Sequence, residues 1–179
     1  MNFKISKSDL KSALATVSKA VSPKSSISIL EGILFTLESG ALTLTGYDLE
    51  IGVTTTIPAE SFDSGKFVVQ PKLIMALIGK LSKDETEISV ENDILKIING
   101  KTEMSLTCLS ADEYPSITNE DGSQTLEIEQ ATLHSLISQT LYAVAVNSTK
   151  PILTGELFEL SNNNLDVVDD AFEYLMSKA

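Results

Sequence analysis

The carboxylates Asp48 and Glu50 are the first residues in the sequence whose types and spacing could do chemistry. Alternate residues of a regular strand point to the same side, so the two carboxylates would lie together. Such a pair can bind a metal ion or act as acid and base in a hydrolase. No histidine and no third ligand lie near them in the sequence. The alternative is a structural bend at Gly46-Tyr47-Asp48, in which Asp48 bonds to nearby backbone amides.

The other reactive side chains give an enzyme little support. His134 is the single histidine, and no G-x-S-x-G nucleophile motif precedes a helix. Cys108 is the single cysteine, and its alternation with Leu106 in an expected strand favours burial. The sequence contains no P-loop, no G-x-G-x-x-G motif and no His/Cys cluster. We therefore expect no catalytic residue, no metal and no cofactor.

Charge is unevenly distributed along the chain. The net charge is −12, yet residues 1–30 hold five lysines and one acid. All 13 basic residues are lysines. Without arginine the chain lacks the side chain suited to bidentate reading of base edges, whereas lysines suit a diffuse attraction to phosphates. This pattern fits a polyanion such as DNA bound without sequence preference; the alternative is ordinary solvation of helix surfaces.

Three segments have the apolar period of amphipathic helices, namely residues 6–21, 71–83 and 130–146. Ser6 resembles a capping residue, and Pro71 suits a first helical turn. The expected solvent sides of the first two helices carry lysines. These are Lys7, Lys11 and Lys19 on the first helix and Lys72, Lys80 and Lys83 on the second. Because strands and loops hold most of the acids, we expect a positive helix face and a negative outside.

The rest of the chain is strand-like, with short β-branched runs between turn residues. The runs cover residues 29–39, 41–46, 51–59, 66–70, 85–92, 94–100 and 102–110. Asn99-Gly100 and Ser39-Gly40 predict β-hairpins between neighbouring runs. The sequence therefore predicts an α+β fold of repeated strand–helix–strand units with antiparallel sheets, and no membrane span.

An internal repeat sets the domain organisation. A shift of 123 residues places Ile29-Leu30 on Ile152-Leu153 and Leu34-Phe35 on Leu157-Phe158 without a gap. Within the first copy, strand-then-helix recurs after about sixty residues. The segment 110–124 is polar and rich in turn residues, which is typical of a linker. We expect a complete domain over residues 1–122 and a partial second domain over 123–179.

Two stretches carry a resemblance to a known family: "SILEGILFTLESGALTLTGYDLEIG" and "CLSADEYP". The sequence resembles the bacterial DNA polymerase III beta subunit, the replicative sliding clamp, over residues 1–168. The resemblance implies a DNA clamp fold, with helices lining the DNA-facing side of a ring and sheets outside. It also implies a non-catalytic processivity factor, cytoplasmic and nucleoid-associated, that tethers the polymerase to DNA. The family resemblance implies that the partner is double-stranded DNA.

The resemblance also assigns residues. It places Lys24, Asn147 and Lys150 in loops that approach DNA, and Met104 and Leu106 on an edge strand at the subunit interface. Because family members are about twice as long, the chain resembles a truncated member. The docking pocket for polymerase and clamp-loader proteins is then expected to be incomplete, and the usual ring not to close.

A second hypothesis is a protein-interaction or dimerisation module that uses exposed edge strands, without DNA clamping. The strand around residues 102–109 and an unfinished second sheet favour pairing with another chain. We therefore expect self-association through edge strands.

Overall fold

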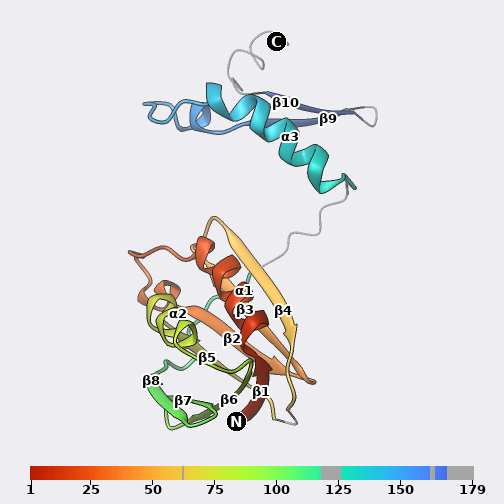
Figure 1. Cartoon of the computed structure of the whole chain (residues 1–179). Helices are drawn as coiled ribbons and strands as arrows, with labels where there is room; N and C mark the ends of the chain where they lie inside the picture. Colours follow the sequence, from red (N-terminus) through yellow and green to blue (C-terminus); the bar gives the residue numbers. More distant parts are fainter. Residues whose placement is uncertain (62, 118–125, 162–163, 169–179) are drawn as a thin grey trace. The chain divides into compact units, whose positions relative to one another are not determined.

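The computed structural model describes residues 1–61, 63–117, 126–161 and 164–168 (Figure 1). The chain divides into two compact units, Met1–Asn119 and Glu120–Ala179. The domain boundary expected after residue 122 lies outside the described residues, as does the tail 169–179. Within the described ranges, no helix has the length and apolar character needed to cross a membrane.

The described residues of the first unit form two α-helices, two short 3-10 helices and eight strands. In chain order they are β1 (Asn2–Ser6), α1 (Lys7–Val17), η1 (Ser18–Ala20), η2 (Ser28–Glu31), β2 (Ile33–Glu38), β3 (Ala41–Tyr47), β4 (Gly52–Pro58), β5 (Gly65–Val69), α2 (Pro71–Gly79), β6 (Glu85–Glu91), β7 (Ile94–Asn99) and β8 (Thr102–Thr107). The predicted strands are confirmed, except that Ile29–Glu31 lie in η2. An apolar pair such as Ile29-Leu30 signals burial but does not distinguish a strand from a helical turn.

The strands form two antiparallel four-stranded sheets, in the orders β1-β6-β7-β8 and β4-β3-β2-β5. Each sheet combines three consecutive strands from one half of the unit with the single first strand of the other half. The sheets also meet at their edges through isolated bridges, Lys4 with Glu60 and Val68 with Leu109. Neither half therefore builds a complete sheet alone.

The two halves share one apolar pattern. A shift of 64 residues places Phe3, Ile5, Leu10, Leu14 and Val17 on Phe67, Val69, Ile74, Ile78 and Leu81, and all ten side chains are buried. They form one core in which α1 and α2 pack against each other and on the sheets (Figure 1). Phe35 of one half stacks on Phe67 of the other, with ring centroids 4.8 Å apart. Burying each such side chain contributes about 2–3 kcal/mol.

The starts of α1 and α2 are set by residues at their N-termini, and the end of α1 is set by its distance from β3. Ser6 caps α1 by accepting a hydrogen bond from the Asp9 amide at 3.2 Å, as its sequence position predicts. Pro71 occupies the first turn of α2. The end of α1 lies so close to β3 that a Cβ at Gly46 would overlap the carbonyl oxygen of Val17. Gly46 therefore sets the distance between helix and sheet.

The two predicted hairpins are confirmed. Ser39 and Gly40 both have positive φ between the paired strands β2 and β3. Gly100 has a φ of +66° between β7 and β8, where Asn99 pairs with Thr102. These are the left-handed conformations that short hairpin turns require.

The second unit repeats the first half of the first unit. It contains α3 (Gln130–Thr140), η3 (Leu141–Ala143), η4 (Pro151–Thr154), β9 (Leu157–Ser161) and β10 (Asn164–Val168). The bounds of α3, η3 and η4 equal those of α1, η1 and η2 shifted by 123 residues. The strands β9 and β10 form an antiparallel pair, as β2 and β3 do. The repeat inferred from the sequence is therefore a repeat of structure.

Candidate nucleic-acid interface

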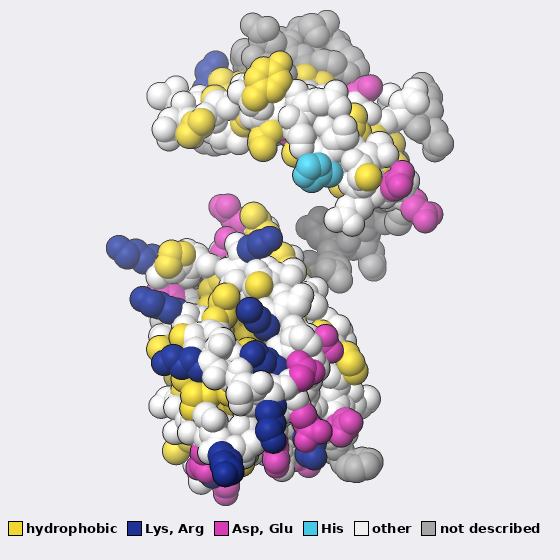
Figure 2. All heavy atoms as spheres, viewed as in Figure 1, with side chains coloured by type: hydrophobic (Ala, Val, Ile, Leu, Met, Phe, Trp, Pro, Cys, Tyr) yellow, Lys and Arg dark blue, Asp and Glu magenta, His cyan; other side chains and the backbone are white. Residues whose placement is uncertain are grey.

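Lysines gather on the helix side of the first unit. The apolar stripe of α1, formed by Leu10, Ala13, Leu14 and Val17, is buried, so its other side faces solvent. The exposed lysines of this region are Lys11, Lys19, Lys24, Lys72, Lys80 and Lys83. Figure 2 shows dark-blue side chains gathered over the face where Figure 1 draws the two helices. The helical period thus predicted the exposed side of α1 and α2 correctly.

Lys7, one of the predicted DNA-binding lysines, already has a structural partner. Its Nζ donates a hydrogen bond of 2.7 Å to the carbonyl oxygen of Leu81, just beyond α2. The side chain therefore ties the start of α1 to the loop that follows α2. Two of the three ammonium protons remain for other acceptors.

The structure corrects the predicted position of Lys83. The pattern placed it on α2, but that helix ends at Gly79, with Lys80 as its C-cap. Lys83 lies in the following loop, where its side chain runs over Gly100: a Cβ built on that glycine would lie 3.0 Å from the Lys83 Cε. The helical period continued past the true helix end because Leu81 is also buried.

The loop carrying Lys83 is held by the start of α1. The Lys7 amide donates to the Asp84 carbonyl oxygen at 2.7 Å, and the Ser8 amide donates to Asp84 Oδ1 at 3.0 Å. These contacts lower the pKa of Asp84, chiefly through the Ser8 amide and then the Ser6 hydroxyl, with a further contribution from the positive charge of Lys7. The ionised carboxylate therefore suits a helix N-terminus.

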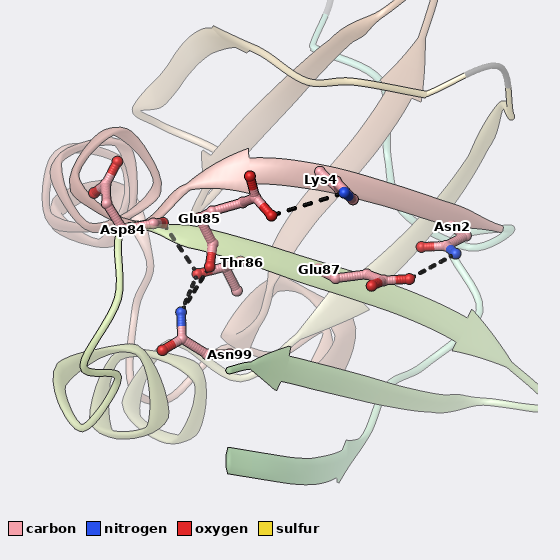
Figure 3. A network of polar contacts seen from close by, with 7 residues as sticks. All are labelled: Asn2, Lys4, Asp84, Glu85, Thr86, Glu87 and Asn99. Carbon is pink, nitrogen blue, oxygen red and sulfur yellow. Dashed lines mark hydrogen bonds and ion pairs between the residues drawn. The ribbon is translucent and has the colours of Figure 1, made fainter. Parts of the chain in front are cut away.

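The side chain of Asn99 holds the same loop by hydrogen bonds. It is buried and makes five hydrogen bonds, accepting from the Ser82 and Lys83 amides and donating to three oxygens. Figure 3 shows its amide directed at Glu85 and Thr86, while Thr86 reaches the Asp84 carbonyl. Sequence reasoning read Asn99 as a turn residue and missed this role, because its partners lie 13 to 17 positions away.

Acidic residues are sparse on the helix face. Residues 7–24 and 70–83 hold seven lysines and one acid, Asp9, whereas the rest of residues 1–117 holds four lysines and 14 acids. Two of those four lysines are in ion pairs: Lys4 with Glu85 at 3.7 Å and Lys96 with Glu103 at 2.7 Å. In Figure 2 the magenta side chains lie mainly toward β4 and the end of the unit near β1 and β6. The helix face is therefore the positive side of a negative unit.

The second unit carries the other two residues predicted to approach DNA. Asn147 and Lys150 are exposed in the connection between η3 and η4. The Lys150 amide is fixed by a hydrogen bond of 3.1 Å to the Ser148 hydroxyl. By the 123-residue register, Asn147 corresponds to Lys24 of the first unit. Their role at DNA remains a prediction.

The candidate acid–base pair, Asp48 and Glu50, belongs to a structural turn. Asp48 and Glu50 lie in the turn between β3 and β4, not in a regular strand. Asp48 Oδ1 accepts hydrogen bonds from the Ile51 amide at 2.7 Å and the Glu50 amide at 3.0 Å. These bonds, led by that of Ile51, lower the pKa of Asp48. The carboxylate therefore closes a turn in which Leu49 has positive φ, as the bend hypothesis predicted.

The remaining candidates have structural surroundings. His134 is exposed on α3, where its Nδ1 lies 3.5 Å from the Ser138 hydroxyl. Cys108 is buried directly after β8, and burial, with Asp93 nearby, raises its thiol pKa. Among the described residues no three histidine, cysteine or acidic side chains gather to hold a metal ion.

An apolar groove lies beside the edge strand β8. It has a volume of about 540 Å³ and is lined by Leu73 and Leu77 of α2 and by Leu106 and Leu109 at the end of the sheet. Met104 and Leu106, the predicted interface residues, are half-buried. Of the described strands, β7 alone pairs with β8. The second edge of β8 and the groove therefore offer an apolar surface for another chain.

Comparison with solved structures defines the class of protein: a DNA clamp fold. The chain matches the crystal structure of the DNA polymerase III subunit beta from Pseudomonas aeruginosa with a TM-score of 0.89 and 28% identity, covering 96% of this chain and 47% of that one. It matches the DNA polymerase sliding clamp from Bacillus subtilis with a TM-score of 0.87 and 32% identity, covering 92% and 46%.

Sequence comparison gives the family. The family model described as DNA polymerase III beta subunit, N-terminal domain, matches residues 1–118, and the chain belongs to this family. It is 34% identical over 174 residues to the beta sliding clamp of Bacillus subtilis and 31% identical over 170 residues to that of Haemophilus influenzae. The chain spans about half the length of these curated relatives, 46% of each.

Proposed function

We propose that the helix face of the first unit binds the phosphate backbone of double-stranded DNA, and that the chain serves as part of a sliding clamp. In this role it tethers DNA polymerase III to DNA as a processivity factor. The observation that carries the proposal is the segregation of charge: seven lysines and one acid on the helix segments of a chain whose net charge is −12.

Lysine is the right residue type for a surface that slides. Its ammonium group is a compact charge on a flexible stem, so it attracts phosphates without fixing a register. The chain has no arginine, the side chain that most often reads guanine by a bidentate contact. The negative outer surface opposes binding of DNA anywhere except at the helices.

The function is non-catalytic: the chain positions a polymerase and makes or breaks no bond itself. Its proposed setting is the cytoplasm, at the nucleoid. Its proposed partners are double-stranded DNA, the polymerase and the clamp loader. Self-association through the edge of β8 is supported by the apolar groove beside Leu106. A protein-interaction module without DNA clamping would keep this groove but needs no positive helix face.

The proposal is tested by the salt dependence of DNA binding. Fluorescence anisotropy of a labelled duplex of random sequence is measured over a salt titration. The test variant changes Lys11, Lys24, Lys72 and Lys80 to Gln. The matched control changes Lys4, Lys66, Lys96 and Lys101 to Gln, which alters the net charge equally outside the helix face.

We expect the helix-face variant to bind more weakly than the control at every salt concentration. The slope of log affinity against log salt should fall by about 0.9 for each phosphate that the variant no longer neutralises. The control should keep the wild-type slope, because its lysines lie on strands and turns outside the helix face. It should also stay folded, because removing an exposed ion pair costs about 0–1 kcal/mol of stability. Equal slopes for the two variants would disprove the helix-face assignment.

A further inference from the structure

Residues 21–27 connect η1 to η2 and carry Lys24, an exposed lysine of the helix face. Val21 packs against the main core, whereas the side chains of residues 22–27 are exposed or half-buried. A connection with so little buried apolar surface depends on polar contacts to keep one conformation. The position of Lys24 therefore depends on the hydrogen bonds that its neighbours make.

Two side chains hold the backbone around Lys24. The Ser22 hydroxyl donates to the Lys24 carbonyl oxygen at 2.9 Å and accepts from the Lys24 amide at 3.4 Å. Glu31 Oε1 accepts a hydrogen bond of 3.3 Å from the amide of Ser25, the next residue along the chain. The first contact closes a local turn. The second ties the connection to η2, of which Glu31 is the last residue.

Glu31 is itself held in place by the core. The two residues before it, Ile29 and Leu30, are buried and form a small cluster with Val68. The amide of Gly32, the residue after it, donates to the Ile29 carbonyl oxygen at 3.2 Å. A Cβ at Gly32 would overlap the Val68 side chain, so the backbone here lies close against β5. The Glu31 carboxylate therefore connects a fixed part of the unit to the connection that carries Lys24.

The charge of Glu31 is of the wrong sign for the surface on which it lies. Its side chain lines a hollow of about 320 Å³ together with Ser22, Pro23 and Lys72. A carboxylate repels phosphates, and salt at 0.1 M screens exposed charges only beyond about 10 Å. Charge alone therefore predicts that removal of the Glu31 carboxylate strengthens DNA binding.

We infer that Glu31 is a positioning residue for DNA binding, an inference that rests on the proposed function. Its carboxylate holds the Ser25 amide, so that Lys24 meets the phosphate backbone from a connection that is already ordered. An ordered connection loses little conformational freedom when DNA binds, which favours affinity. This gain outweighs the repulsion by one negative charge. Removal of the carboxylate then weakens DNA binding, which is the opposite of what charge alone predicts.

The sign of the effect is measured by fluorescence anisotropy of a labelled random-sequence duplex with the full chain. Glu31→Ala should weaken binding at 0.1 M salt by up to about eightfold, the contribution of one phosphate contact with a slope of about 0.9 relative to 1 M salt. Glu31→Gln keeps an acceptor oxygen and should bind at least as tightly as wild type. Asp9→Asn removes an exposed acid of α1 and should also bind at least as tightly. Tighter binding by Glu31→Ala would overturn the inference.

A shorter acid separates reach from charge and serves also if Glu31→Ala fails to fold. Glu31→Asp keeps the negative charge but is one methylene too short to reach the Ser25 amide. It should bind DNA at least as weakly as Glu31→Ala, because it keeps the repulsion and loses the hydrogen bond. Wild-type affinity for Glu31→Asp would overturn the inference, since charge alone predicts that result.

A double-mutant cycle tests whether Glu31 acts through Lys24. Lys24→Gln should lower the salt slope by up to about 0.9. In that background Glu31→Ala should cause no further weakening, because there is no longer a lysine to position. An equal loss with and without Lys24 would assign the effect to general stability, and the inference would be wrong.

Hydrogen exchange of the Ser25 amide, measured without DNA, tests the contact itself. Glu31→Ala and Glu31→Asp should speed this exchange about three- to tenfold, as expected for the loss of one hydrogen bond, and Glu31→Gln should not. Unchanged exchange in all three variants would overturn the inference but leave the proposed function untouched. If instead the four-lysine helix-face variant bound DNA as its control does, the proposed function would fail and this inference with it.

Discussion

Asn99 holds the backbone of Lys83 by two hydrogen bonds. The Lys83 amide donates to Asn99 Oδ1 at 2.9 Å, and Asn99 Nδ2 donates to the Lys83 carbonyl oxygen at 2.9 Å. The buried amide thereby fixes the loop from which a lysine of the proposed DNA-binding face projects. An uncharged, buried residue thus helps to position the positive face.

The first prediction concerns this bond pair. Asn99→Ala leaves the Ser82 and Lys83 amides and the Glu85 carbonyl oxygen without their buried partner, so we expect a loss of unfolding free energy of about 3 kcal/mol. Urea unfolding measures it. Asn2→Ala is the control, since Asn2 is exposed and its side chain makes one bond, of 3.0 Å to Glu87 (Figure 3). Equal losses for both variants would contradict the role given to Asn99.

The Asn99-Gly100 pair also shows how far sequence reasoning reaches. The dipeptide predicted the hairpin correctly, because turn conformation depends on adjacent residues. The network around Asn99 depends on the loop 82–86, which only the folded chain brings beside it. The same limit applies to Lys83: a helical period gives the buried side of α2, but not the residue at which the helix ends.

The second prediction concerns the glycine at the close approach of helix and sheet. Gly46→Ala would force the new methyl group into the Val17 carbonyl oxygen, so we expect destabilisation of about 1–3 kcal/mol. Gly79→Ala is the control: a Cβ there meets nothing within 4 Å, and alanine should stabilise the end of α2 by up to about 1 kcal/mol. Thermal unfolding distinguishes the two. If Gly46→Ala left the stability unchanged, α1 would have moved to accommodate the new methyl group without an energetic cost.

The glycine marks another boundary of sequence reasoning. The motif Gly46-Tyr47-Asp48 was correctly interpreted as structural, and Asp48 closes the turn as expected. Gly46, however, lies within β3 with ordinary φ, so its need for glycine comes from Val17, 29 positions earlier. The 123-residue repeat predicted the structure more reliably than this short motif did. A repeated pattern reflects tertiary contacts as well as local ones.

The third prediction concerns Tyr114, whose ring packs against the small core cluster of Ile29, Leu30 and Val68. Burial raises the pKa of Tyr114 to about 12, although its hydroxyl bonds to backbone. Because this folded-state pKa lies above the ordinary value of 10, the contribution to stability is complete below pH 10 and is lost as the pH rises toward 12. Phenolate absorbance should show a late-titrating step, and Tyr114→Phe should remove it.

The last prediction concerns the contact between Asp84 and the start of α1. The folded-state pKa of Asp84 lies below its ordinary value of 3.8, first because the Ser8 amide donates to the carboxylate. A lowered pKa means that the folded protein favours the ionised form more than the unfolded chain does. The carboxylate therefore contributes stability above about pH 4, and this contribution is lost as the pH falls through the folded-state pKa.

Asp84→Asn should consequently destabilise the protein at neutral pH, and the difference from wild type should shrink as the pH falls below about 4. Urea unfolding at a series of pH values measures this difference. Glu91→Gln makes the same charge change at the exposed end of β6 and should give a smaller difference at neutral pH. A difference for Asp84→Asn that is constant with pH would show that packing, and not the ionised carboxylate, holds the loop to α1. In that case Lys83 would keep its position in acid.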